Sequence, residues 1–254
     1  MARFDLSDAE WAIIAPLLPN KPRGVPRTDD RRVLNGIFWT LRTGSPWRDL
    51  PERYGPYTTV YNRYNRWAKA GVWLRIFEAL AARSPDSLHL IDSSIVRAHQ
   101  HAAGGKKGAR ITIGRSRGGL STKIHAVVDA VGLPVRLLLT PGQASDKTTL
   151  PNLIEGLRPA LEAIADRGYS ARFIIELFAQ RGTTAHIPSQ SNVRVVRTVD
   201  LQRYRQRNLV ERFFNKLKHL RRIATRYDKL ARNFLAAVTL ASIRIQIRHY
   251  ESTT

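Results

Sequence analysis

The sequence predicts an α/β protein in which a helical N-terminal region precedes a domain built on a mixed sheet. Two changes of pattern carry this prediction. Apolar residues recur at helical spacing through residues 1–83, and strand-like segments then alternate with helix-like segments up to about residue 200. Helical spacing returns over 201–249. We therefore expect one domain at 1–83 and a second domain at 84–254.

The N-terminal region is expected to form four helices, at about 7–18, 28–43, 58–70 and 72–83. The first begins at Ser7, which Glu10 follows three residues later, and this pairing is the signature of a capping box. The second ends at Gly44, a residue type that favours the end of a helix. Thr58 or Thr59 is the expected N-cap of the third helix.

The third helix is short and polar, and it follows a tight loop. It carries Asn62, Arg63, Asn65 and Arg66. Such a helix suits a helix-turn-helix, in which Arg63 and Arg66 would contact DNA. The pattern is equally typical of a plain helical bundle with a solvated face, and the sequence leaves both interpretations open.

Strand-like and helix-like segments alternate after residue 84, as a mixed sheet with covering helices requires. Strands are expected at 88–96, 122–130, 133–142, 161–168 and 183–188, with helices near 147–158 and at 171–182. The segment 97–119 is Gly-rich and basic without a clear period, so we expect a mobile connection between the first two strands. Its Lys106, Lys107 and Arg110 are candidates for contact with a DNA backbone.

The charge of the chain indicates a polyanionic partner. Lys and Arg number 42 against 20 Asp and Glu, which gives a formal charge of +22 spread along the chain. Nucleic acid is the polyanion that most often neutralises such an excess. The absence of cysteine excludes disulfides and thiolate metal sites. Because the chain has neither a signal-like N-terminus nor an apolar run of about 18 residues, we expect a cytoplasmic protein with no membrane partner.

Two aspartates occupy positions at which a carboxylate needs an explanation. Asp92 follows the apolar run 88–91 on an expected strand, where burial of a charge is costly unless it is paired or metal-bound. Asp166 follows another expected strand, at the sheet edge where ligands of α/β proteins gather. Purely structural uses, as a capped strand end and as a turn residue, remain open. Asp129 and Asp146 are better explained as turn and N-cap residues.

The helix-like segment 205–219 carries one acid, Glu211, among many bases. At 100° per residue, Tyr204, Arg207, Glu211 and Lys218 fall within about 60° of one another, at the border of the apolar face. A helix packed on the sheet would direct this stripe toward the sheet edge. A salt-bridged surface is the alternative, but the position of the stripe favours a site.

These residues resemble a known family. Tyr204-x2-Arg207-x3-Glu211-x6-Lys218 is similar to the Tyr-Arg-Glu-Lys signature of bacterial insertion-sequence transposases of the DDE class. The segments "LIDSSIVRAHQHAAGGKKG", "PGQASDKTTL" and "ADRGYSA" resemble the insertion sequence five group, as do "LSDAEWAIIAPLLP" and "GSPWRDLPERYGPYTTVYNRYNRW". The resemblance covers nearly the whole chain.

The resemblance implies a ribonuclease-H-like catalytic domain with Asp92, Asp166 and Glu211 as catalytic residues and ligands of two Mg²⁺ or Mn²⁺ ions. Tyr204, Arg207 and Lys218 would contact DNA near the cut. The implied enzyme binds the terminal inverted repeats of its element, frees the 3′ ends by hydrolysis and joins them to target DNA by transesterification. Implied partners are double-stranded DNA and a second copy of the chain or more, in a nucleoid-associated complex. A domesticated DNA-binding protein and a structure-specific nuclease on the same fold are the alternatives.

Overall fold

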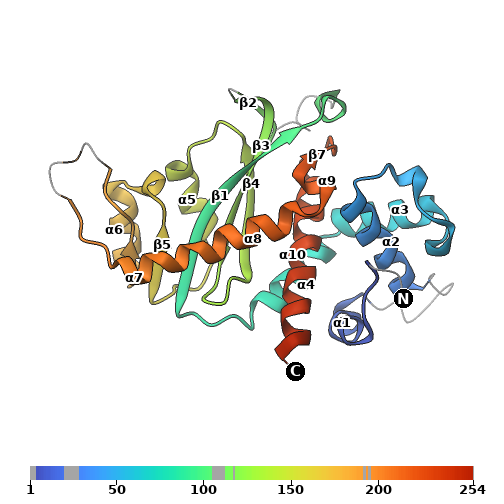
Figure 1. Cartoon of the computed structure of the whole chain (residues 1–254), viewed down its shortest axis with the longest axis horizontal. Helices are drawn as coiled ribbons and strands as arrows, with labels where there is room; N and C mark the ends of the chain where they lie inside the picture. Colours follow the sequence, from blue (N-terminus) through green and yellow to red (C-terminus); the bar gives the residue numbers. More distant parts are fainter. Residues whose placement is uncertain are drawn as a thin grey trace. The chain divides into compact units, whose positions relative to one another are not determined.

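The computed structural model describes residues 4–19, 29–104, 112–116, 118–190, 193 and 196–253. The chain packs into two compact units, drawn in Figure 1. The helical unit comprises Met1–Leu80, His99–Ala109 and Lys216–Thr254, and the sheet unit comprises Ala81–Ala98 and Arg110–Asn215.

The helical unit is built mainly from helices that belong to the two end regions of the chain. Its elements are α1 (Asp8–Ile14), η1 (Ala15–Leu17), α2 (Asp30–Thr43), η2 (Trp47–Asp49), η3 (Glu52–Tyr54), α3 (Tyr57–Lys69), α4 (Val72–Ala81), η4 (Gln100–Gly104), α9 (Arg221–Ala224), β7 (Thr225–Arg226) and α10 (Ala231–Thr253). The long helix α10 packs against α1, α2 and α3. Residues 216–254, which the sequence assigns to the second domain, thus pack with the N-terminal helices, and the division at residue 83 stays a prediction.

The ends of the N-terminal helices test the predicted caps. The Ser7 side chain accepts from the Glu10 N–H while Glu10 accepts from the Ser7 N–H, which confirms the capping box. Gly44, at φ 74°, ends α2 in the left-handed conformation that glycine adopts without strain. The predicted cap of α3 was wrong, because the helix begins at Tyr57 after Pro56 and makes no side-chain cap. The fixed φ of proline orients the chain there instead.

Glu10 also joins the two ends of the helical unit. Its side chain is 2% exposed, and its Oε2 accepts from Arg244 Nη2 at 2.8 Å. Oε1 accepts from Arg248 Nε at 3.2 Å. Both arginines belong to α10, so the carboxylate of α1 neutralises a guanidinium that the fold buries.

We predict that Glu10→Ala destabilises the helical unit by about 3–5 kcal/mol, because Arg244 would remain buried without its carboxylate. Asp8→Ala is the matched control, since Asp8 lies on the same helix, is 85% exposed and pairs with Arg31 at 2.7 Å. Its cost should stay below about 1 kcal/mol. Urea unfolding followed by far-UV circular dichroism measures both, and equal losses would contradict the prediction.

The sheet unit contains the predicted mixed sheet. Its elements are β1 (Leu88–Ala98), β2 (Gly114–Ser116), β3 (Gly119–Val128), β4 (Pro134–Pro141), α5 (Asp146–Ile154), β5 (Glu162–Ala165), η5 (Arg167–Tyr169), α6 (Arg172–Gln180), β6 (Thr184–His186), α7 (Leu201–Tyr204), η6 (Arg205–Arg207) and α8 (Asn208–Lys218). The strand order is β2-β3-β1-β5-β6, with β4 also paired to β3. β1 is antiparallel to β3 and parallel to β5, and β5 is parallel to β6.

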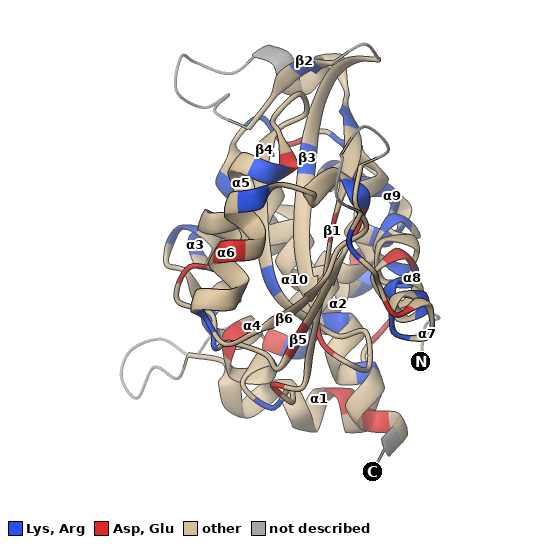
Figure 2. Cartoon of the chain, turned by 90° about the vertical axis from the view of Figure 1, so that its left-hand side faces the viewer, with Lys and Arg blue, Asp and Glu red and all other residues tan. Residues whose placement is uncertain are grey.

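Helices cover both faces of this sheet. Figures 1 and 2 show α5 and α6 on one face and α8 on the other. The α5–α6 face holds an apolar cluster that includes Ile91, Val127, Leu150 and Phe178. Because successive side chains of a strand point to opposite faces, Asp92 is directed to the α8 face and its neighbour Ser93 to the α5 face.

Two segments differ from the sequence predictions. The connection 97–119 contains the end of β1 and the short strand β2, whose pairing with β3 the sequence pattern did not indicate. Residues 105–111 and 117 of this segment lie outside the described part. The basic stretch from 201 is not one helix either, because η6 separates α7 from α8. A 3-10 turn advances about 120° per residue instead of about 100°, so η6 turns the later residues of the predicted stripe by about 60° relative to Tyr204 and leaves the stripe on one side of the segment.

Candidate active site

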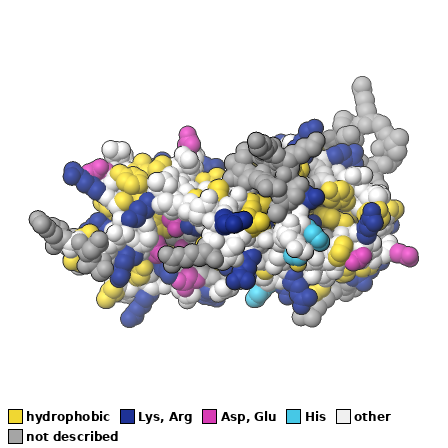
Figure 3. Space-filling view, turned by 90° about the horizontal axis from the view of Figure 1, so that it is seen from above, with side chains coloured by type: hydrophobic (Ala, Val, Ile, Leu, Met, Phe, Trp, Pro, Cys, Tyr) yellow, Lys and Arg dark blue, Asp and Glu magenta, His cyan; other side chains and the backbone are white. Residues whose placement is uncertain are grey.

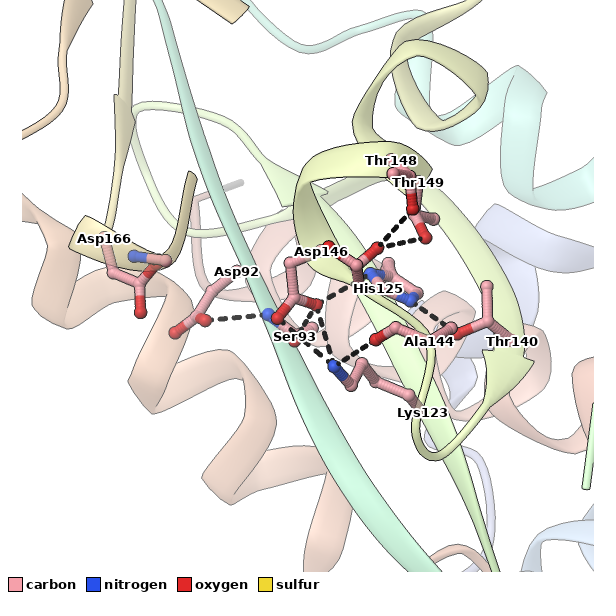
Figure 4. Close-up of polar contacts among 12 residues, drawn as sticks. Asp92, Ser93, Lys123, His125, Thr140, Ala144, Asp146, Thr148, Thr149 and Asp166 are labelled. Atoms are coloured by element: carbon pink, nitrogen blue, oxygen red, sulfur yellow. Dashed lines mark hydrogen bonds and ion pairs between the residues drawn. The ribbon is translucent and has the colours of Figure 1, made fainter. Parts of the chain in front are cut away.

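Asp92 and Asp166 are brought together by the pairing of two parallel strands. Ile91 on β1 pairs with Ala165 on β5, so each aspartate directly follows a paired residue. Neighbouring strands lie about 4.8 Å apart. In the close-up of Figure 4, the carboxylates of Asp92 and Asp166 face the same space. Asp166 lies directly after the end of β5, as the sequence predicts, and Asp92 lies within the predicted strand β1, opposite Ala126 of β3.

Asp166 combines a structural and a site position. It is the N-cap of η5, and its Oδ1 accepts from the Gly168 N–H at 2.8 Å. A Cβ at Gly168 would lie 2.8 Å from Asp166 Oδ1, too close for any side chain there. The turn after β5 therefore fixes the carboxylate through a glycine, and the predicted turn role and the predicted site role coexist.

Arg207 links the third acid to the first. The turn η6 lies against β1 and β5, which places Arg207 beside the two aspartates. Its Nη1 donates to Asp92 Oδ2 at 2.9 Å, and its Nη2 donates to Glu211 Oε1. Glu211 lies in the first turn of α8, where the helix dipole favours a negative charge. Val210, Phe213 and Phe214 are buried beside it, as the predicted apolar face requires.

The electrostatics of Asp92 show that the three acids share one environment. The pKa of Asp92 is raised to about 6, chiefly by burial, and the charges of Asp166 and Glu211 contribute to this rise. The Ser93 N–H, which donates to Asp92 Oδ1 at 2.7 Å, and Arg207 oppose this rise. For Arg207, burial alone would lower the pKa, but the charges of Asp92 and Glu211 raise it overall. The site therefore holds an excess of negative charge that needs a cation.

The donor set fits hard divalent cations. Mg²⁺ is usually bound by one or two carboxylates together with phosphate oxygens and water. Within the described residues, no three Asp, Glu, His or Cys side chains are arranged to hold one ion by themselves. Arg207 occupies the space between Asp92 and Glu211 through its two ion pairs. A cation held by these oxygens would therefore take the place of the guanidinium.

The other predicted site residues fall in three groups. Tyr204 ends α7, is half-buried and lies close enough to Arg207 to affect the pKa of that guanidinium. Lys218 is exposed on α8, seven residues after Glu211. Lys106, Lys107 and Arg110 lie outside the described residues.

Arg63 and Arg66 lie on α3 in the helical unit and have different exposure. Arg63 is 5% exposed and forms an ion pair with Asp30. Its guanidinium also lies 5.1 Å from the Trp67 ring centre. This buried position does not favour the predicted DNA contact of Arg63. Arg66 is exposed, so the same prediction stays open for it.

Sequence reasoning missed a second polar cluster next to the acids. Figure 4 shows Ser93, Lys123 and His125 around Asp146, on the α5 face of the sheet. The predicted role of Asp146 as an N-cap was wrong, because Ser145 precedes α5 and Asp146 is its first residue. The sequence did contain a signal, since Lys123 and His125 lie on either side of Ile124 in a strand whose later residues are all buried. By contrast, Asp129 accepts from Val131 and Leu133 N–H groups in the predicted turn.

Two family models match the chain. The model described as "Transposase DDE domain" matches residues 83–245, and the model described as "Putative transposase of IS4/5 family" matches residues 6–77. The first covers more than half of the chain. The chain belongs to the DDE transposases of bacterial insertion sequences. The family resemblance seen in the sequence is thereby confirmed.

Relatives of this transposase chain are found in several bacteria. It is 40% identical over 130 residues to "Putative transposase for insertion sequence element IS6501" of Brucella ovis, an alignment that spans 51% of this chain and 100% of that protein. It is 44% identical over 110 residues to "Uncharacterized protein y4sN" of Sinorhizobium fredii, spanning 42% of this chain and 88% of that protein.

The fold of the transposase chain also has a solved counterpart. The piggyBac transposase, in a synaptic complex with hairpin DNA, superposes with a TM-score of 0.55 over 96% of this chain and 71% of that chain. At 10% sequence identity this likeness concerns the fold alone. Together with the DDE domain match it confirms the predicted ribonuclease-H-like fold. In the ranges that the structure describes, no helix is long and apolar enough to cross a bilayer.

We predict that Mn²⁺ binding to the chain weakens as the pH falls through about 6, the pKa of Asp92. A ligand carboxyl must lose its proton to bind a metal, so at pH 5 the affinity should be roughly tenfold lower than at pH 7.5. Electron paramagnetic resonance of free Mn²⁺ measures this. Asp92→Asn should remove most of the binding, whereas Asp86→Asn, a partly exposed acid paired with Arg158, should not. Equal affinity at the two pH values would contradict the assignment.

Proposed function

We propose that this chain is the catalytic transposase of an insertion sequence. It binds the terminal inverted repeats, cleaves DNA there by metal-dependent hydrolysis and joins the freed 3′ ends to target DNA by transesterification. The observation that supports this most strongly is the gathering of Asp92, Asp166 and Glu211 around Arg207. Because two element ends must be joined in one event, the active form is at least a dimer on DNA, associated with the nucleoid.

The three acids would hold two Mg²⁺ or Mn²⁺ ions. When bound, such a pair activates the attacking oxygen and stabilises the leaving oxygen at phosphorus. Asp92 contributes its charge only above a pH of about 6, so the site is competent at neutral pH. The Gly168 N–H holds the Asp166 carboxylate in place, so this side chain would need to move little during the reaction.

Arg207 has two successive partners in this proposal. In the chain alone its guanidinium neutralises Asp92 and Glu211. With a cation held by these acids, Arg207 would be free to donate from its planar guanidinium to phosphate oxygens near the cut. Tyr204 positions the strand beside it, and Lys218 contacts the backbone further along α8. Lys106, Lys107 and Arg110 add contacts with the DNA backbone.

Surface charge supports a DNA partner. In Figure 3, acidic side chains gather in one region of the visible face, and Lys and Arg side chains lie around them. Figure 2 shows Lys and Arg recurring along α8 with acidic residues among them. A basic surface around an acidic centre binds phosphates at its rim and metal ions at its centre.

We predict that Glu211→Gln abolishes 3′-end release, by at least about 1,000-fold, while binding of end DNA survives. Glutamine keeps the size of the side chain but removes the charge that binds a cation. Gel analysis of labelled duplexes that carry the element's inverted repeats measures cleavage and joining, with Mg²⁺ and with excess EDTA. Wild-type protein should be inactive in EDTA.

The matched control is Glu176→Gln, because Glu176 is a half-exposed acid of α6 that pairs with Arg172 in its own helix. Its cleavage rate should equal that of the wild type. Unchanged cleavage by Glu211→Gln would remove Glu211 from the site. Binding without any cleavage by the wild type would favour a binding protein, and cleavage without preference for the ends or joining would favour a nuclease.

We predict that Arg66→Ala weakens binding of end DNA and lowers the slope of log K against log salt by about 1, as the loss of one phosphate contact requires. Arg66 is exposed on α3, where the sequence indicates DNA contact. Arg75→Ala is the control, since Arg75 is exposed on α4 and bonds to the Ala70 carbonyl. Fluorescence anisotropy at several salt concentrations measures both. Equal slopes for the two variants would exclude Arg66 from the interface.

A further inference from the structure

A second carboxylate cluster lies directly behind the first one, on the opposite face of β1. Asp146 Oδ1 accepts from Ser93 Oγ at 2.7 Å, and both its oxygens lie 3.2 Å from Lys123 Nζ. Lys123 Nζ also donates to the Ala144 carbonyl at 2.8 Å. The dashed lines of Figure 4 trace these bonds to Asp146. The cluster therefore anchors the start of α5 to β1 and β3.

This cluster has no net charge. His125 pairs with Ser93 across the strands, and burial lowers its pKa to about 4, so it is neutral near pH 7. Its Nε2 lies 2.8 Å from the Thr140 hydroxyl, and its Nδ1 lies 3.5 Å from Asp146 Oδ1, too long for a strong hydrogen bond. The positive charge of Lys123 thus balances Asp146 alone. A neutral, bonded cluster holds its geometry whether or not a cation is bound to the first cluster.

Ser93 bonds to an aspartate of each carboxylate cluster and so connects the two clusters. Its hydroxyl is bonded to Asp146, and its backbone N–H donates to Asp92 Oδ1 at 2.7 Å. The buried Tyr169 hydroxyl is affected by both clusters. Burial raises the pKa of Tyr169 well above its ordinary value, and the charges of Asp146 and Asp92 raise it further. A shift of Ser93 would therefore turn the Asp92 carboxylate relative to Asp166.

We propose that Asp146 is a positioning residue for Asp92, acting through Ser93, and that it sets the affinity of the site for divalent cations. Lys123 holds Asp146, Asp146 holds the Ser93 hydroxyl, and the Ser93 N–H holds Asp92. Outer partners of metal ligands of this kind change metal affinity about 10–100-fold when removed. This inference rests on the proposed function, because it assigns Asp92 to cation binding.

The test measures Mn²⁺ affinity in the absence of DNA and of turnover. Ser93→Ala removes the hydroxyl but keeps the backbone N–H to Asp92, and we expect Mn²⁺ to bind about tenfold more weakly. Asp146→Asn should weaken binding at least as much, since it also leaves Lys123 without its charge partner. Ser93→Thr retains the hydroxyl on a strand that accepts β-branched residues, and it should stay within about twofold of wild type.

Ser87→Ala and Asp86→Asn are the matched controls, because both residues precede β1 in the sheet unit and Asp86 pairs with Arg158 at 3.2 Å. Both should bind Mn²⁺ as the wild type does. Folded Ser93→Ala and Asp146→Asn with wild-type affinity would overturn the inference while leaving the proposed function intact. If Asp146→Asn does not fold, the difference in Mn²⁺ affinity between Ser93→Ala and Ser93→Thr tests the inference by itself. Wild-type protein that binds no Mn²⁺, or binds it equally after Asp92→Asn, would overturn the proposed function and the inference with it.

Discussion

The guanidinium of Arg207 lies between Asp92 and Glu211 and forms ion pairs with both. Without a positive charge there, the carboxylates would repel each other, and the raised pKa of Asp92 reflects its burial first and this repulsion second. Arg207, a residue of the same chain, supplies the positive charge that reduces this repulsion. The packing of η6 against β1 and β5 brings this cation to the sheet, and the first turn of α8 carries Glu211 beside it.

The alternation of side chains along β1 divides the polar residues between two faces. Asp92 points to the side on which α8 lies, and Ser93 points to the side on which α5 begins. One face holds the carboxylates that carry net negative charge, and the other holds a neutral cluster around Asp146. A change that shifted the register of β1 by one residue would exchange the two faces, so both clusters depend on the same strand pairing.

The sequence was sufficient for the mixed sheet and for its longer strands, because periodicity reports them directly, and it drew attention to the acids that the structure places near Arg207. The sequence did not predict the features that depend on how the elements pack against one another. The apolar face of α8 could be predicted from spacing, but the 3-10 turn before it could not, since such a turn has no distinct residue pattern. The sequence pattern predicts a DNA contact for Arg63, whereas in the structure its guanidinium pairs with Asp30 in the interior of the helical unit. The role of Asp146 depends on cross-strand neighbours, which a single sequence does not reveal.

The central claim is that Asp92, Asp166 and Glu211 form one cation site that Arg207 occupies until metal arrives. Crystals of the full chain soaked in Mn²⁺ test it directly through anomalous scattering at the manganese edge. The account predicts anomalous peaks within about 2.0–2.4 Å of carboxylate oxygens of these acids, with the Arg207 guanidinium moved away from Asp92. Saturating Mn²⁺ that leaves Arg207 bridging Asp92 and Glu211, with no peak at the three acids, would contradict it.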